Sequence, residues 1–114
     1  MVNLGASFVS TEDFKKLDIR VGTIVKVERI RRTEKLYKMV VDLGPLGTKQ
    51  TVASLVGYYT PEQLLGRKVV FLANLKPVKF SGELSEGMIL TADQENVVSL
   101  LTVDTEVPDG VRVV

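Results

Sequence analysis

The stretch DIRVGTIVKVERI, residues 18–30, is the part of this sequence that decides the fold. Apolar or β-branched side chains recur at every second position from Ile19 to Val27, which is the pattern of a long strand with one buried face. Gly22 interrupts the pattern, and a glycine in mid-strand marks a bulge or a sharp bend. Such a bend lets one strand belong to both sides of a small barrel, so we expect a barrel built around residues 18–30.

Further strands and one helix follow this stretch. The sequence predicts strands over residues 38–44, 48–56, 67–75, 87–92 and 97–103. Thr60 supplies a cap, Pro61 suits the first helical position and Gly66 stops the helix, which places it between the third and fourth strands. Another short turn of helix is predicted from Ser10, if Phe14 and Leu17 dock against the rest of the chain.

These elements together predict an all-β OB fold, a five-stranded Greek-key barrel with one short helix between strands three and four. We expect a single domain over residues 1–114, with a core at about 13–92 and a C-terminal β extension at 93–114. Residues 111–114 end the chain with apolar side chains. This segment needs a partner, and it either closes the barrel or pairs across a subunit interface.

Composition excludes several classes of function. The 114 residues include neither cysteine nor histidine, which removes disulfides, thiolate or imidazole metal sites and the Ser-His-Asp class of hydrolase. We therefore expect no catalytic residue, no metal and no cofactor. No run approaches the roughly 20 apolar residues of a membrane span, and the N-terminus lacks the pattern of a signal peptide. The expected location is cytoplasmic, with no membrane partner.

Charge is unevenly distributed although the net charge is only +1. Residues 26–38 hold six basic and two acidic side chains, and residues 67–82 hold four basic and no acidic ones. Residues 83–114 hold seven acidic side chains against one basic side chain. A basic half of this kind favours a nucleic-acid partner, although charged loops are most often simply solvated.

The loop of residues 74–88 carries the most unusual chemistry. It is longer than a hairpin needs, so it either folds on itself or serves a ligand. Lys76 and Lys79 lie in it, and an OB fold brings this loop beside the one that holds Lys35. These lysines could neutralise phosphates while Phe80 or Tyr37 stacks on a base. Phe80 could equally be a core residue.

Several motifs in order resemble the structure-specific tRNA-binding domain family, which includes the C-terminal domain or β subunit of methionyl-tRNA synthetases. The likeness runs from about residue 13 to 92 and rests on segments 17–22, 35–37 and 51–56, and above all on Asn74-Leu75-Lys76-Pro77-Val78-Lys79 with Gly82, Leu84, Ser85 and Met88. The loop before Leu36 departs from many relatives, because it reads Arg31-Arg32-Thr33-Glu34 here.

The resemblance implies an OB fold that binds tRNA by its shape and does no chemistry itself. It implies a tRNA-contacting surface formed by Asn74, Lys76, Lys79, Ser85 and Met88, with Arg20, Lys35 and Lys49 as further candidates. It also implies a homodimer, and a methionyl-tRNA synthetase catalytic chain as a partner. Met1 and the short length favour a separate chain, although a β subunit or an excised domain stays open.

Two other functions stay open beside tRNA anchoring. One bacterial branch of the same family resembles a dimeric chaperone for export-bound proteins, in which an apolar groove would hold extended peptide by edge-strand pairing. A purely structural module that docks a synthetase through residues 111–114 is the third possibility.

Overall fold

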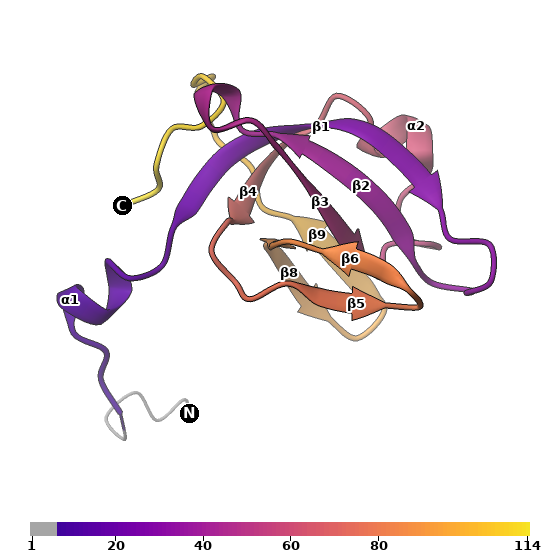
Figure 1. Ribbon diagram of the computed structural model, residues 1–114, viewed down its shortest axis with the longest axis horizontal. Coiled ribbons are helices and arrows are strands. Elements are labelled where there is room, and N and C mark those ends of the chain that lie inside the picture. Colours follow the sequence, from indigo (N-terminus) through magenta and orange to yellow (C-terminus); the bar gives the residue numbers. More distant parts are fainter. Residues whose placement is uncertain (1–6) are drawn as a thin grey trace.

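Five antiparallel strands form a nearly closed barrel in the computed structural model, which describes residues 7–114 (Figure 1). Their order around the barrel is β3-β2-β1-β4-β7. The bounds are β1 (Ile19–Arg29), β2 (Tyr37–Asp42), β3 (Thr48–Ala53), β4 (Lys68–Leu72) and β7 (Met88–Ile89). Helix α2 (Pro61–Leu64) lies between β3 and β4 and is capped by Thr60. The predicted OB-type barrel is confirmed, with its helix in the predicted place.

The gap between β3 and β7 is bridged by side chains. Thr51 of β3 is fully buried, and its Oγ1 donates a 2.9 Å hydrogen bond to the carbonyl of Gly87, next to β7. The Ser85 hydroxyl donates to the same carbonyl at 3.1 Å. A buried carbonyl needs such partners, so these two hydroxyls satisfy it at the point where the barrel closes.

Strand β1 pairs with β4 through residues 19–23 and with β2 through residues 23–29, so it belongs to both sides of the barrel as predicted, but its β-bulge lies at Val25 and not at Gly22. Its register against β2 slips between Ile24 and Lys26, which makes Val25 the extra residue of a β-bulge and leaves Val25 exposed. Ile19 therefore faces a small cluster beside Val70, while Ile24 and Val27 face the main core. The single buried face expected from Ile19 to Val27 was wrong, because one inserted residue exchanges the two faces of a strand.

Gly22 has a packing role three residues before the bulge. A Cβ at this position would lie 2.6 Å from Cγ1 of Val41 and 2.8 Å from Cδ2 of Leu43. The glycine therefore lets β2 cross close over β1.

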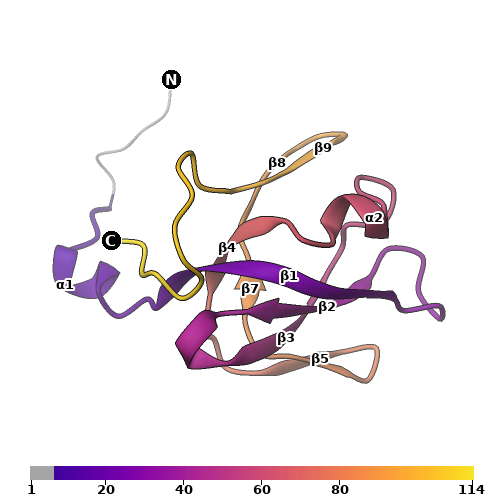
Figure 2. The ribbon, with the colours of Figure 1, turned by 90° about the horizontal axis from the view of Figure 1, so that it is seen from above.

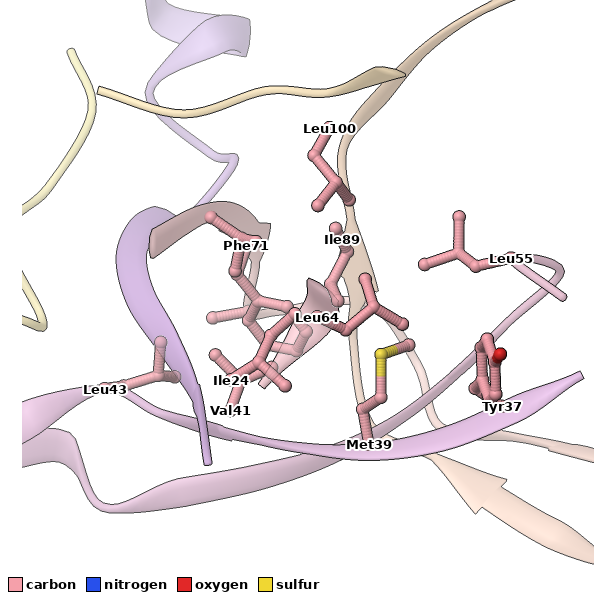
Figure 3. Packing of buried hydrophobic residues seen from close by; sticks show 12 residues of the cluster. Ile24, Tyr37, Met39, Val41, Leu43, Leu55, Leu64, Phe71, Ile89 and Leu100 are labelled. Atoms are coloured by element: carbon pink, nitrogen blue, oxygen red, sulfur yellow. The ribbon is translucent and has the colours of Figure 1, made fainter. Parts of the chain in front are cut away.

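The main core fills the barrel between β1, β2, β4, β7 and α2 (Figure 3). Phe71 of β4 is completely buried at its centre, and Leu64 closes the core from α2. Full burial of one such side chain stabilises the fold by about 1.5–3 kcal/mol. The members are Ile24, Tyr37, Met39, Val41, Leu43, Leu55, Leu64, Val69, Phe71, Ala73, Ile89 and Leu100.

Two hairpins extend from the barrel. One consists of β5 (Val78–Phe80) and β6 (Glu83–Ser85), and the other of β8 (Thr91–Gln94) and β9 (Val97–Leu100). Figure 1 shows both below the barrel strands, and Figure 2 shows β5 and the β8–β9 hairpin on opposite sides of the molecule. The strand predicted over residues 87–92 is divided at Leu90 into β7 and β8.

The ends of the described chain lie on the same side of the barrel (Figures 1 and 2). The turn of helix predicted from Ser10 is α1 (Thr11–Phe14), with the Ser10 hydroxyl accepting from the amide of Asp13. A 3-10 turn, η1 (Gly44–Leu46), joins β2 to β3. No helix within residues 7–114 is long and apolar enough to cross a membrane.

The C-terminal segment pairs with β1 of its own chain. The amide of Val21 donates to the carbonyl of Val111 at 2.9 Å, and the amide of Val113 donates to the carbonyl of Ile19 at 2.8 Å. Residues 111–114 form a single bridge, between Arg112 and Arg20, and no full strand. Of the two partners expected for this segment, the structure contains the one within the barrel.

Candidate nucleic-acid interface

The loop of residues 74–88 folds on itself as the β5–β6 hairpin. Its turn places Ser81 and Gly82 at positive φ, 50° and 80°, and two such residues give a turn whose twist matches the strands it joins. Gly82 is therefore a turn residue. Gly87 is a glycine for another reason, because a Cβ there would lie 2.6 Å from the carbonyl oxygen of Leu72 and against the ring of Phe71.

The hairpin is attached to the free edge of β3 by side-chain hydrogen bonds. The amide of Val52 donates to Oγ of Ser85 at 3.1 Å, and the amide of Gln50 donates to Oε1 of Glu86 at 2.9 Å. The amide of Glu86 donates to the carbonyl of Gln50 at 2.8 Å. These bonds satisfy the outward-facing backbone groups of β3 and fix the position of the hairpin.

Charged side chains hold the other side of the hairpin. Arg32, from the loop between β1 and β2, donates through Nε to the carbonyl of Ser81 at 2.9 Å and pairs with Glu83 at 3.1 Å. Lys38 of β2 lies between Glu83 at 3.2 Å and Glu28 at 3.4 Å. The prediction that the two basic loops lie side by side is confirmed.

These ion pairs shift the pKa values of Glu83 and Lys38. The Arg32 guanidinium, followed by the Lys38 ammonium, holds the pKa of the Glu83 carboxyl below its ordinary value. The hydrogen bonds that the Lys38 ammonium donates to Glu83 and, second, to Glu28 raise the pKa of Lys38. Both groups keep their charges near neutral pH, so the ion pairs that fix the hairpin persist there.

Three predicted site residues present a free cationic surface. Lys76, Lys79 and Lys35 are exposed, and none of them forms an ion pair within residues 7–114. Lys76 and Lys79 lie on either side of Val78 at the start of the hairpin, and Lys35 lies in the loop before β2. Free ammonium groups in this position can pair with phosphates.

Two apolar side chains lie beside Lys76. Phe80 and Met88 are each 45% exposed and line one shallow cavity together with Val52, Leu75 and Val78. Tyr37, the other proposed stacking residue, is buried in the core and donates its hydroxyl to the carbonyl of Tyr59 at 2.8 Å. Phe80 is therefore the stacking candidate that the fold exposes.

Asn74 and Arg20 bond to the protein itself. Oδ1 of Asn74 accepts from the amide of Asp18 at 2.9 Å, and its Nδ2 donates to the carbonyl of Lys16 at 2.7 Å. Arg20 pairs with Asp18 at 2.6 Å and donates to the carbonyl of Gly110 at 3.0 Å. The Asn74 bonds fix the beginning of the loop of residues 74–88 to the segment that leads into β1, and the Arg20 bonds join that segment to the C-terminal part of the chain.

The side chains of Lys49 and Ser85 also form hydrogen bonds within the protein. Nζ of Lys49 donates to the carbonyl of Ala73 at 2.9 Å, and Ser85 is buried between β3 and Gly87. The eight predicted residues therefore form two groups. Lys35, Lys76, Lys79 and Met88 are exposed and form no side-chain hydrogen bond or ion pair within residues 7–114, whereas Asn74, Ser85, Arg20 and Lys49 bond to other parts of the chain. Contact of any of them with tRNA stays a prediction.

Sequence reasoning missed the residues that attach the hairpin, notably Gln50, Glu83 and Glu86. A signal was available, because Ser81-Gly82 is flanked by Val78 to Phe80 and by Glu83 to Ser85, which is the pattern of a two-residue hairpin. A hairpin inside this loop would have predicted that side chains must tie it to the barrel. Their identity depends on the register between β3 and β6, which no local pattern encodes.

A small barrel with exposed lysines and an exposed aromatic side chain around one loop defines a nucleic-acid-binding OB-type domain. Comparison with known proteins makes this class more specific. The sequence profile of the tRNA binding domain family matches residues 19–112. The chain belongs to this family of tRNA-binding domains.

Its relatives connect it with methionine–tRNA ligases. The enzyme of Archaeoglobus fulgidus is 48% identical over 105 residues, which cover 92% of this chain, and that of Methanocaldococcus jannaschii is 51% identical over 100 residues, or 87% of this chain. The chain spans only 15–16% of the length of these two ligases.

Solved structures of similar length also match. A MetRS-related protein from Pyrococcus horikoshii is 41% identical with a TM-score of 0.87, covering 94% of this chain and 98% of that protein. The chaperone CsaA from Bacillus anthracis is 31% identical with a TM-score of 0.85, covering 95% of this chain and 100% of that protein.

Proposed function

We propose that this chain is a non-catalytic anchor that holds tRNA for a methionyl-tRNA synthetase catalytic chain. The observation that supports this most directly is that Lys35, Lys76 and Lys79 are exposed and form no ion pair within residues 7–114, with Phe80 and Met88 exposed beside Lys76. Phosphate contacts from lysine supply affinity that depends on salt, and the fixed positions of the loops select a folded RNA.

The proposed division of labour follows from the hydrogen bonds. Lys35, Lys76, Lys79 and Met88 contact the tRNA, and Asn74, Ser85, Arg20 and Lys49 position the backbone that presents them. Holding tRNA near a catalytic chain raises its local concentration and lowers the apparent KM without any new chemistry. The cytoplasm, where aminoacylation takes place, is the proposed location.

We also propose a homodimer formed through an apolar surface near the two ends of the chain. Phe14 and Leu17 are about two-fifths exposed and line a cavity of about 370 Å³ with Val113 and Val114. An exposed apolar patch of this kind is typical of an interface.

Binding to unfractionated tRNA across a salt series tests the anchor. Lys76→Ala combined with Lys79→Ala should weaken binding, and the negative slope of log K against log salt should become less steep by roughly 0.7–0.9 for each phosphate that is no longer neutralised. Lys26→Ala combined with Arg67→Ala is the matched control, because it removes two exposed positive charges that lie outside residues 74–88 and form no ion pair within residues 7–114. Equal slopes for the two double variants would contradict the assignment of these lysines.

Aminoacylation kinetics test the partner. The full chain should lower the KM for tRNA of a methionyl-tRNA synthetase catalytic chain with little change in kcat. The variant carrying Lys76→Ala and Lys79→Ala should lose that effect. An unchanged KM at saturating concentrations of the full chain would exclude the proposed partnership.

A further inference from the structure

A continuous groove crosses the underside of the barrel between the two hairpins. Three cavities of about 150, 240 and 570 Å³ follow one another there. The first two share Phe80 and Met88, and the last two share Asp93 and Val98, so the groove runs from β5 past β7 to β8 and β9. Figure 2 shows the ribbons of β5 and of the β8–β9 hairpin on opposite sides of the molecule.

Aromatic side chains and lysines lie at both ends of this groove. Phe80 lies at one end with Lys76 in the same cavity, and Tyr58, which is 47% exposed, lies at the other end with Lys35. An aromatic face beside an ammonium group suits a nucleotide, whose base stacks while its phosphate is neutralised.

The edge of β3 that borders the groove cannot readily accept an extended peptide. Its outward amides at Gln50 and Val52 already donate to the side chains of Glu86 and Ser85. A peptide that added a strand here would have to displace both bonds, and strand addition depends on free backbone groups. The occupied edge of β3 and the aromatic side chains that line the groove therefore favour a ligand that binds by stacking.

We propose that the groove receives unpaired nucleotides of the tRNA, with bases stacked on Phe80 and Met88 at one end and on Tyr58 at the other. This inference rests on tRNA binding and adds that part of the recognition is made through bases exposed outside the helical stems. Asp93 lines the middle of the groove, where its carboxylate repels phosphate. The phosphates therefore follow the outer edge, at Lys76, Lys79 and Lys35.

Truncation of the stacking side chains is the first test. Phe80→Ala and Met88→Ala should each lower the affinity for unfractionated tRNA by about 5- to 150-fold, the range expected for loss of one stacked base. The salt slope should stay unchanged because no charge is removed. Leu46→Ala is the matched control, since Leu46 is 53% exposed in η1, outside the groove. Thermal unfolding of each variant checks that it is folded.

A fluorescent reporter is the second test, made possible because the chain contains no tryptophan. The Phe80→Trp variant has a single indole in the groove, and its emission should be quenched by tRNA and by a short single-stranded RNA but not by a blunt RNA duplex. Leu46→Trp should show no quenching with any of the three.

The outcomes separate this inference from the proposed function. If the unmodified chain fails to bind tRNA, both are overturned. If it binds tRNA while Phe80→Ala, Met88→Ala and Leu46→Ala bind equally well, only the groove assignment is overturned. Quenching of Phe80→Trp by an unfolded peptide and not by single-stranded RNA would overturn it too, and would make the groove a peptide site.

Discussion

The small side chain of Ser85 joins three parts of the structure through hydrogen bonds. Its buried hydroxyl accepts from the amide of Val52 and donates to the carbonyl of Gly87, so it joins β3, β6 and the approach to β7. Buried backbone groups that lose a partner cost about 1–3 kcal/mol each. A family-signature residue can therefore matter for the interface without touching the ligand.

Replacement of Ser85 tests this role. Ser85→Ala should lower the free energy of unfolding by about 1–3 kcal/mol, because the Val52 amide loses its acceptor and Gly87 one of its donors. Urea denaturation measures the change. Ser99→Ala on the exposed face of β9 is the control and should change stability by less than about 0.5 kcal/mol. Equal effects of the two substitutions would refute the role assigned to Ser85.

Individual residues show the limit of prediction from sequence. The lysines Lys76 and Lys79 are exposed as charge alone would suggest, and Tyr37 is buried although its residue type suits stacking. The difference lies in strand parity, because Tyr37 begins β2 on the face that points into the core. Which face is inside depends on the register between strands, and local sequence does not contain it.

At the scale of elements, the β5–β6 hairpin is held by polar contacts on both sides. Gln50 and Glu86 tie it to β3, while Arg32 and Lys38 tie it to the loop after β1 and to β2. Polar attachments exchange with water more readily than buried apolar ones. The hairpin should therefore respond to pH and salt before the barrel does.

The titration of Glu83 gives a prediction for this hairpin. Its pKa is lowered in the folded protein, so its contribution to stability is complete above the unfolded value of about 4.3 and is lost as the pH falls through the folded value. Between about pH 5 and pH 3 the Tm of the unmodified chain should fall more steeply than that of Glu83→Gln.

The control for this experiment is Glu95→Gln, which removes an exposed carboxylate that forms no ion pair within residues 7–114. Its Tm should follow the unmodified chain across the same range. If Glu83→Gln does so as well, the ion pairs of Arg32 and Lys38 contribute nothing measurable to folding.

The elements themselves were largely predictable. Alternating apolar residues located the barrel strands, and the Thr60-Pro61 signal located α2. The bulge at Val25 was missed, because Val25 has the same residue type as the buried positions around it and only the pairing with β2 shows that it is the extra residue. The bulge or bend was predicted at Gly22, whose lack of a side chain allows Val41 to pack against it.

At the scale of the whole molecule, the chain has two exposed surfaces that carry apolar side chains. One contains Lys76 with Phe80 and Met88 beside the β5–β6 hairpin, and the other contains Phe14, Leu17 and Val114 near the ends of the chain. A dimer through the terminal surface would leave the groove of each copy open, and two grooves in one particle would raise the avidity for tRNA.

The oligomeric state tests that arrangement. The unmodified chain should sediment as a dimer, and Phe14→Glu should convert it to a monomer, because a carboxylate cannot be buried there without a partner. Leu65→Glu is the matched control, since Leu65 is exposed at the end of α2, and it should leave the dimer intact. A monomeric unmodified chain, or a dimeric Phe14→Glu variant, would exclude this interface.

The pairing of the C-terminal segment with β1 has a mechanical consequence. Arg112 donates to the carbonyls of Lys15 and Leu17, and Val113 pairs with Ile19, so the segments before β1 and at the end of the chain are fastened to each other. A force applied between the two ends would open these few bonds one after another, because the two segments run antiparallel and leave the pairing at the same end, before it reached the barrel. The domain could therefore be tethered to a larger polypeptide at either end, and pulled by it, while the groove between the hairpins kept its shape.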